Sequence, residues 1–324
     1  MTKRATLAQV AAYAGVSIAT ASRAFSDPTL VRPETIAIIR QAAVALHYKA
    51  PRILERNLSM ARIAVFTRLF HRHGELERLR GISNALRPWP HELLLYDVDD
   101  SLASIDYVKK LVVTKRIEGV IFSGVLVAPE VAIYLKRFQI PSVLIDNDDA
   151  RFSRVFTSDK KGSELAADFF NKSKSSKILL LGARPTALDL HPGIRLQSFR
   201  EHLDPKKRLA STELLVDPTS VEAVSEIRKI LTAKKPPDAI FADSDLLAMT
   251  VIFLARELNI SIPGDCSLIG YGDTDTAEIL GITSVRTHLD ASGRRSVEIL
   301  RSTEEFGQIT RHELEPELII RSTT

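Results

Sequence analysis

The chain has 324 residues, of which 45% are hydrophobic and 26% charged, and a formal net charge of +4. These values are typical of a globular protein with room for a small domain beside a two-lobed larger one, and the single cysteine, Cys266, excludes an internal disulfide framework. No apolar stretch approaches the roughly 20 residues of a membrane span or follows the basic start as a signal peptide would, so we expect a cytoplasmic protein.

The positive charge is concentrated at the start of the chain. Residues 1–60 carry eight Lys/Arg against three Asp/Glu, which leaves 36 against 37 for the remainder of the 44 and 40 in the whole chain. A small basic module on a near-neutral body indicates that the module contacts a polyanion. Taken alone, the excess is also compatible with a chance distribution of surface charge.

Residues 6–15 predict a short helix followed by a tight turn. Thr6 and Gln9 have the spacing of a capping box, in which each side chain satisfies a backbone amide of the other. Apolar residues recur behind them at helical spacing: Leu7, Val10, Ala11 and Ala14. Gly15 supplies the left-handed conformation that ends such a helix.

Two more helices are predicted before residue 48. Ser17 is expected to cap a helix that begins at Ile18 and ends at about Phe25, before Asp27-Pro28. This helix would bury Ala21 and either Ala24 or Phe25. Pro33 begins the next helix, whose apolar stripe is Ile36, Ile39, Ala43 and Leu46. Two short helices joined through glycine and closed by a third match the helix-turn-helix plan. Any small three-helix bundle has similar spacing, so the pattern alone leaves that alternative open.

The residues themselves are more specific than their spacing. The stretch from Thr6 to Phe25, with its Ala14-Gly15-Val16-Ser17 run, resembles the headpiece of the LacI/GalR family of transcriptional regulators, and so does the later run 45–48, Ala-Leu-His-Tyr. The resemblance is tight over residues 5–48 and looser over the rest of the chain. It implies a sequence-specific DNA-binding regulator, a repressor, that binds a pseudo-palindromic operator as a homodimer and responds to a small-molecule effector.

The resemblance also implies which residues touch DNA. Ile18, Ala19 and Arg23 stand where the family reads bases, and because two of the three are apolar we expect contacts to thymine methyl groups or to DNA shape. The remaining DNA contacts expected in the headpiece are Ser17, Thr20, Ser22, Thr6 and Tyr48. Arg32 stands where a capping serine is common, which costs a little helix stability.

Residues 49–61 are predicted to be a hinge segment between the headpiece, 1–48, and the core, 62–324. About eight helix-forming residues are too few for a stable isolated helix. In the resembled family this segment becomes a helix on DNA, which implies that Arg56 contacts DNA and that Leu58 wedges into the minor groove. One extra residue between Tyr48 and Pro51 departs from the family pattern, and a plain tether is the alternative.

The core predicts two doubly wound lobes. Short apolar runs alternate with helical segments from residue 62 onward, which indicates parallel sheets covered on both faces. We expect an α/β periplasmic-binding-protein-like core, with one lobe at about 62–155 and 289–324 and the other at about 156–288. Ligands of such folds bind beyond the carboxyl ends of the strands.

The effector contacts are implied by the family resemblance and by that loop rule. Arg195 stands where the family ligates sugar hydroxyls, and Phe70 and His71 follow the first strand, where ligand-stacking side chains lie. Asp245 either accepts hydrogen bonds from ligand hydroxyls or caps the helix that begins there. The other expected contacts are Asp159, Tyr271 and Asp273.

Two pocket positions depart from the family. Gly272 replaces an acid that commonly binds ligand, which leaves Asp273 as a substitute, and Ser158 stands where an Asp is common. The effector, a sugar or sugar derivative, is therefore not necessarily an ordinary neutral sugar. Lys160 and Lys161 either meet a phosphate or carboxylate or are simply solvated.

We expect no enzyme activity, no metal and no cofactor. The sequence has no Gly-x-Gly-x-x-Gly opening a helix, no Walker loop, no His-Glu-x-x-His and no Gly-x-Ser-x-Gly, and His71 and His73 lack further ligands for a metal. Cys266 precedes a buried strand and is expected in the core rather than as a nucleophile. The alternative is a cytoplasmic ligand-binding protein or enzyme on the same two-lobed fold with a degenerate headpiece. The C-terminus has no apolar heptads for a tetramer, and inducer and corepressor fit equally well.

Overall fold

The structure is a computed structural model, and it divides the chain into two compact units: residues 1–62 with 87–92, and residues 63–86 with 93–324. It describes residues 5–26, 31–46, 48, 61–69, 74–98, 106–111, 117–186, 189–190, 193–302 and 309–324. Among these, no helix combines the length and apolar character needed to span a bilayer.

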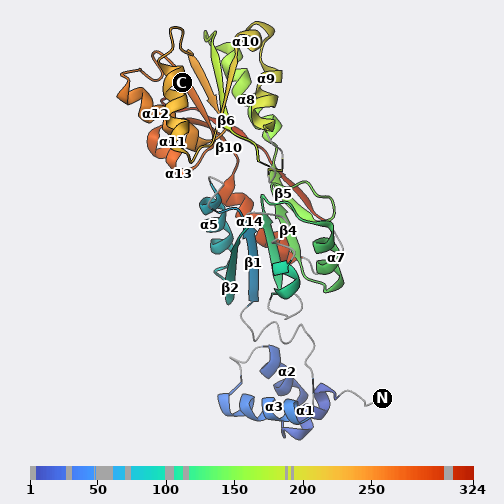
Figure 1. The fold of residues 1–324 in the computed structure, drawn as a ribbon. Helices are drawn as coiled ribbons and strands as arrows, with labels where there is room; N and C mark the ends of the chain where they lie inside the picture. Colours follow the sequence, from blue (N-terminus) through green and yellow to red (C-terminus); the bar gives the residue numbers. More distant parts are fainter. Residues whose placement is uncertain are drawn as a thin grey trace. The chain divides into compact units, whose positions relative to one another are not determined.

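Three helices form the headpiece, as predicted: α1 (Leu7–Tyr13), α2 (Ile18–Ser26) and α3 (Pro33–Ala45) (Figure 1). The capping box is present, because Gln9 N donates to Thr6 Oγ1 at 3.3 Å and Thr6 N donates to Gln9 Oε1 at 2.8 Å. Gly15 has a φ of 65°, the left-handed conformation that the turn requires. The small core between the helices is formed by Val10, Ala24, Phe25, Ile39, Ala42 and Ala43.

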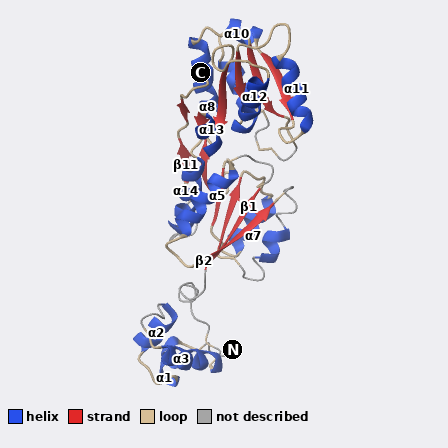
Figure 2. Cartoon of the chain, turned by 90° about the vertical axis from the view of Figure 1, so that its left-hand side faces the viewer, coloured by secondary structure: helices blue, strands red, loops and turns tan. Residues whose placement is uncertain are grey.

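The first lobe contains a sheet with the strand order β11-β5-β4-β3-β1-β2. Its strands are β1 (Ala61–Thr67), β2 (His91–Asp97), β3 (Gly119–Ser123), β4 (Ser142–Ile145), β5 (Ser153–Thr157) and β11 (Arg311–Leu314). The pairings β1–β3, β3–β4, β4–β5 and β5–β11 are parallel. The main helices beside it are α5 (Glu75–Leu86), α7 (Pro129–Arg137) and α14 (Leu289–Ser302) (Figure 2). Two buried apolar clusters share its strands, so both faces of the sheet are covered.

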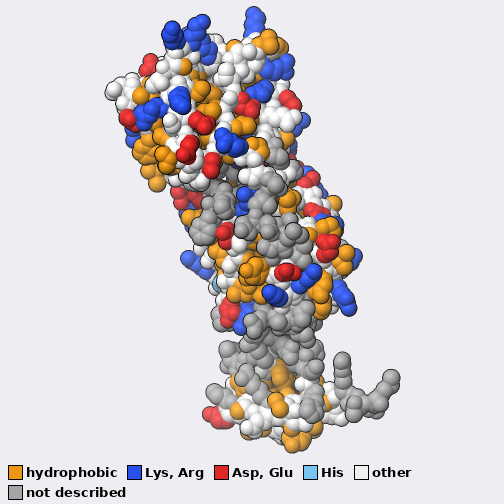
Figure 3. Space-filling view, viewed as in Figure 1, with side chains coloured by type: hydrophobic (Ala, Val, Ile, Leu, Met, Phe, Trp, Pro, Cys, Tyr) orange, Lys and Arg blue, Asp and Glu red, His pale blue; other side chains and the backbone are white. Residues whose placement is uncertain are grey.

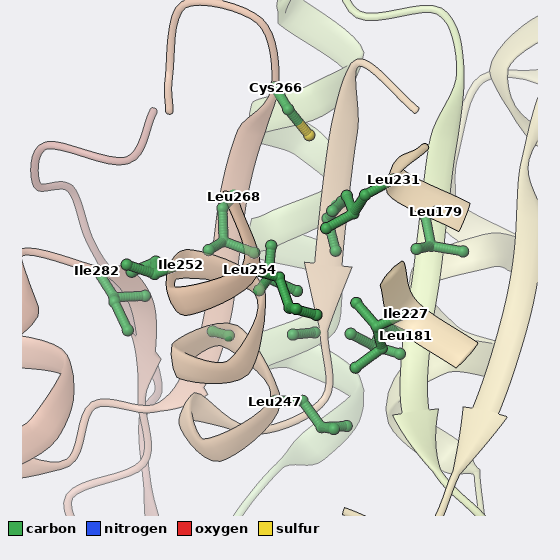
Figure 4. Close-up of a cluster of buried hydrophobic side chains, with 14 of the residues drawn as sticks. Leu179, Leu181, Ile227, Leu231, Leu247, Ile252, Leu254, Cys266, Leu268 and Ile282 are labelled. Carbon is green, nitrogen blue, oxygen red and sulfur yellow. The ribbon is translucent and has the colours of Figure 1, made fainter. Parts of the chain in front are cut away.

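The second lobe repeats this plan with the order β12-β10-β9-β8-β6-β7. Its strands are β6 (Ile178–Ala183), β7 (Thr212–Val216), β8 (Ala239–Ala242), β9 (Ser267–Gly272), β10 (Thr283–Arg286) and β12 (Glu317–Ile319). Its helices are α8 (Asp159–Lys172), α9 (Ile194–His202), α10 (Pro205–Ala210), α11 (Val221–Leu231), α12 (Asp245–Glu257) and α13 (Asp275–Leu280). Figure 4 shows the apolar cluster between this sheet and the helices α11 and α12.

One boundary differs from the sequence-based expectation. The sequence predicts that residues 289–324 belong to the first lobe, but β12 lies in the sheet of the second lobe, where it pairs antiparallel with β10 through Ser284 and Ile319. Only Glu315 and Pro316 separate it from β11, which remains in the first sheet. The tail beyond β12 is tied to the second lobe because Thr323 Oγ1 donates to Leu268 O at 2.7 Å. A three-residue strand carries no pattern that tells which sheet edge it joins.

The single cysteine gives a test of this core. Cys266 is only 3% exposed, and burial raises the pKa of its thiol to about 12. We expect a thiol-reactive disulfide such as DTNB at pH 8 to react with the folded protein roughly a hundredfold or more slowly than with the unfolded chain, because the thiolate is the nucleophile. Release of one equivalent of chromophore should follow only in guanidinium chloride. Rapid reaction of the folded protein would place Cys266 outside the core.

Candidate functional site

The exposed face of α2 is the candidate nucleic-acid surface. Ser17, Ile18, Ala19 and Arg23 are exposed, and Ala21 on the other side of the helix is fully buried. Ile18 is 56% exposed, so a large apolar side chain stands free at the start of this helix. This face combines an apolar contact with a guanidinium, the side-chain types that meet thymine methyl groups and guanine edges in the major groove.

The other expected DNA contacts have structural partners. Ser17 Oγ accepts from Thr20 N at 3.0 Å and lies 2.8 Å from Thr20 Oγ1, so these hydroxyls sit together at the start of α2, while Ser22 is half-buried. Thr6 is exposed and engaged in the capping box. Tyr48 is half-buried with its ring 5.8 Å from that of Phe25, and burial raises the pKa of its phenol. Two expected contacts of the hinge segment lie outside the described residues: Arg56 and Leu58.

A second candidate site is a cavity of about 360 Å³ in the core. Residues that directly follow strands of both sheets line it: Arg68 follows β1, Asp146 follows β4 and Asp243 follows β8. The expectation that ligand-facing groups lie beyond the carboxyl ends of the parallel strands therefore agrees with the position of this cavity.

Three of the expected effector residues meet in the wall of the cavity formed by the second lobe. Arg195 on α9 donates from Nε to Asp159 Oδ1 at 2.9 Å and from Nη1 to Asp243 O at 2.8 Å. Its guanidinium lies 4.1 Å from the centroid of the Tyr271 ring, and the Tyr271 hydroxyl donates to Asp159 O at 3.2 Å. Burial by itself would lower the pKa of Arg195, but the charges of Asp159, Tyr271 and Asp243 outweigh it and raise that pKa.

The first lobe contributes a buried ion-pair cluster that the sequence analysis missed. Arg78 on α5 donates to Glu75 at 2.5 Å, to Asp146 at 2.5 Å and to Ser123 Oγ at 3.2 Å. Glu75 also accepts from Thr67 Oγ1 at 2.8 Å. In the sequence, Glu75 and Arg78 resemble the charges of any solvated helix, and the packing of α5 against α14 and against the ends of the strands buries them.

Arg68 is the other residue missed. It is 8% exposed, lines the cavity and donates from Nη1 to Asp189 at 3.0 Å, which links the two lobes. Asp189 also accepts from Thr186 N at 2.7 Å. Within the described part of the chain, the buried Nε of Arg68 has no hydrogen-bond acceptor. Its position directly after β1, at the carboxyl end of a parallel strand, is the signal by which the sequence could have identified it.

Two expected effector contacts do not line the cavity. Asp245 is fully buried and accepts from Ser284 Oγ at 2.6 Å and from Thr274 N at 2.8 Å, so it joins β10 to the start of α13. It neither faces the cavity nor caps its own helix. Asp273, the expected substitute for the missing acid, accepts instead from Arg286 at 2.7 Å and from Arg321 at 2.6 Å. Phe70, His71 and His73 lie outside the described residues.

The atypical positions divide in the same way. Gly272 lines the cavity with a φ of 123°, a conformation that L side chains rarely adopt. Ser158 caps α8 by accepting from Lys161 N at 3.3 Å. Lys161 pairs with Glu313 and Glu315, and Lys160 lies 4.0 Å from Glu164. Neither lysine lines the cavity. Across the described residues, no three His, Cys, Asp or Glu side chains are grouped to hold a metal.

Comparisons with known proteins agree with this architecture. Residues 6–50 match the family model of bacterial regulatory proteins, lacI family, and residues 167–324 match that of the periplasmic binding protein-like domain. The HTH-type transcriptional repressor PurR of Vibrio atlanticus (strain LGP32) is 25% identical over 98% of each chain.

Solved structures give the same fold. The complex of the transcriptional regulator CelR with cellobiose superposes with a TM-score of 0.65 at 22% identity, over 99% of this chain and 100% of that one. The lac repressor dimer bound to operator and the anti-inducer ONPF superposes with a TM-score of 0.70 at 21% identity, over 99% of each chain.

The burial of Asp245 predicts a structural role. Replacement of Asp245 by Ala leaves the buried donors of Ser284 and Thr274 unpaired, so we expect the free energy of unfolding to fall by about 3 kcal/mol in urea denaturation. The exposed Glu278→Ala on the neighbouring helix α13 serves as a control and should change it by less than about 0.5 kcal/mol. An Asp245→Ala protein of unchanged stability would contradict this assignment.

Proposed function

Because this chain belongs to the lacI family of bacterial regulatory proteins, we propose that it is a transcriptional repressor of the bacterial cytoplasm that binds a pseudo-palindromic operator as a homodimer under the control of a small-molecule effector. The observation that carries this proposal is the exposed face of α2 on a capped helix-turn-helix. The headpiece would comprise residues 1–48, the hinge 49–61 and the core 62–324.

The headpiece supports specific reading of the major groove. Ile18 and Ala19 would contact bases through apolar surface, and Arg23 would reach guanine or phosphate. The phosphate backbone of the DNA would be bound by the hydroxyls of Ser17 and Thr20 at the start of α2. The other residues proposed to contact it are Ser22, Thr6 and Tyr48. In the hinge, Arg56 would add a contact and Leu58 would insert into the minor groove.

Exposed apolar side chains on the core support a dimer. Phe253 on α12 is 55% exposed and Ile279 on α13 is 81% exposed, and these two helices contact each other. Leu76 on α5 is exposed next to them, because Arg80 of α5 donates to Asp275 of α13 at 2.7 Å. Hydrophobic side chains are visible over this region in Figure 3. A second copy would cover this surface, and two headpieces would then read the two half-sites.

The cavity supports control by an effector. Arg68 and Asp189 pair across it from different lobes, so a ligand that enters between them would change how the lobes are held together. We infer that this rearrangement alters the spacing of the two hinges in the dimer and thereby the affinity for DNA; ligand and DNA would affect each other's binding equally.

A sugar or sugar derivative is the effector class that we propose. A cavity of about 360 Å³ accommodates a molecule of that size, and carboxylates and guanidiniums line it, as hydroxyl recognition requires. Cellobiose in the CelR complex is a precedent on the same fold.

Selection of binding sites tests the DNA-binding role. The purified protein should enrich a short pseudo-palindrome from a randomised duplex pool at moderate salt, because two half-sites fix its symmetry. Arg23→Ala should weaken the affinity for that site roughly 10-fold to 100-fold through loss of a base contact. Arg208→Ala removes an exposed arginine of α10 and should leave the affinity unchanged. If no sequence is enriched, with or without mixtures of small molecules, the operator-binding proposal fails.

Sedimentation velocity tests the dimer. The protein should sediment at twice its chain mass of 35.9 kDa, and Ile279→Glu should convert it to the monomer because a charge would be buried at the interface. Leu209→Glu places the same charge at a side chain that is 88% exposed on α10, and it should remain dimeric. A dimer of unchanged affinity in Ile279→Glu would exclude this surface as the interface.

A further inference from the structure

We propose that the effector is a hydroxylated small molecule that carries a protonated amine, with Asp243 as the acceptor for its ammonium group and Arg68 as the donor to one of its oxygens. The proposal rests on the proposed effector-binding role of the cavity and narrows the chemical class of its ligand, which makes an amino sugar the simplest candidate.

The charges that line the cavity favour a cation over an anion. The described lining residues include three guanidiniums and five carboxylates: Arg68, Arg78 and Arg195, and Glu75, Asp146, Asp159, Asp189 and Asp243. Each of the three guanidiniums is already paired with a carboxylate. A phosphate entering the described part of the cavity would therefore meet only guanidiniums whose charge is already balanced, whereas an ammonium group would meet an excess of negative charge.

Asp243 is the carboxylate in this set without a paired guanidinium. Its Oδ2 accepts from the neutral backbone amide of Ala183 at 2.8 Å, and its carboxylate is also hydrogen-bonded to Ser244. Arg195 binds the backbone oxygen of Asp243, so its charge acts on the carboxylate without a direct ion pair. Burial raises the pKa of Asp243, because a carboxylate removed from water lacks full compensation. An ammonium group beside it would supply that compensation and stabilise the ionised carboxylate.

Arg68 supplies the complementary donor. Its Nη1 is held by Asp189 at 3.0 Å, and its buried Nε has no acceptor among the residues that the structure describes. A buried guanidinium N–H without a partner costs free energy, which a hydroxyl or ring oxygen of the ligand would recover. A neutral oxygen suffices, because the charge of Arg68 is already balanced by Asp189.

These two groups belong to different lobes. Arg68 follows β1 of the first sheet, and Asp243 follows β8 of the second. Gly272 adds no side chain to the wall of the second lobe, which leaves Asp243 to meet a donor group of the ligand there. A ligand with an amine for one residue and an oxygen for the other would bind both lobes at once.

Isothermal titration calorimetry on the full-length protein tests this proposal with D-glucosamine, D-glucose and D-glucose 6-phosphate, and with the galacto and manno counterparts of each. In at least one series we expect the amino sugar to bind about tenfold or more tightly than the parent sugar, and the phosphate to bind least. Asp243→Asn keeps an acceptor for the Ala183 amide and should reduce the preference for the amine to within about threefold.

Two further variants separate charge from folding. Glu222→Gln removes an exposed carboxylate from α11 and should leave the preference unchanged. Arg68→Lys keeps the charge that balances Asp189 but loses the Nε donor, so it should weaken the amino sugar and the parent sugar by the same factor and retain their ratio.

Every other outcome overturns the proposal. Equal binding of amine and parent sugar would exclude recognition by charge but leave a sugar effector standing, and tightest binding of the phosphate would contradict the charge argument itself. If none of the compounds binds, the amino-sugar class fails. In that case the repressor role is unaffected, because selection of DNA sites tests it independently of these sugars.

Discussion

The parallel direction of the strands is the constraint on which the core depends. In each parallel sheet, successive strands deliver the residues that follow them to the same edge, and this brings Arg68, Asp146 and Asp243 to one cavity although about 175 residues separate the first from the last. So many charged groups are tolerated away from water only because they neutralise one another. The pairings of Arg78 with Glu75 and of Arg195 with Asp159 are therefore conditions for forming this cavity as well as features of its lining.

Ion pairs within one lobe and between the two lobes affect the relative motion of the lobes differently. The cluster of Arg78, Glu75 and Asp146 lies within one lobe and is buried, so it holds α5 and β4 in place whichever way the lobes move. Arg80 and Asp275 join the lobes on an exposed surface, where an ion pair contributes less than about 1 kcal/mol. Contacts of this kind exchange readily, which is compatible with the proposed rearrangement of the two lobes around a ligand.

The stability of the headpiece is limited by its small size. Three short helices bury few side chains, so end-capping contributes a large share of their stability, and the paired bonds of Thr6 and Gln9 provide it for α1. Although this core is small, Ile18 remains exposed, where its burial would stabilise the fold. Single exposed apolar side chains are common, and Tyr13 and Val44 of the headpiece are also exposed, so the proposed DNA contact of Ile18 rests on its position at the start of α2.

The sequence by itself determined the three headpiece helices, the two α/β lobes and the family. Local signals decide these features: capping residues, glycine at the turn, apolar periodicity and a run of family-specific residues from Thr6 to Tyr48. It also indicated that Asp159, Arg195 and Tyr271 belong together.

Only the tertiary structure decided which charged side chains become buried and which residues they pair with. Asp245 and Asp273 directly follow the cavity residues Ser244 and Gly272, yet three hydrogen bonds and two arginines engage them elsewhere. Glu75 and Arg78 resemble surface charges until α14 packs over them, because burial and pairing depend on elements more than 200 residues apart, which no local pattern records.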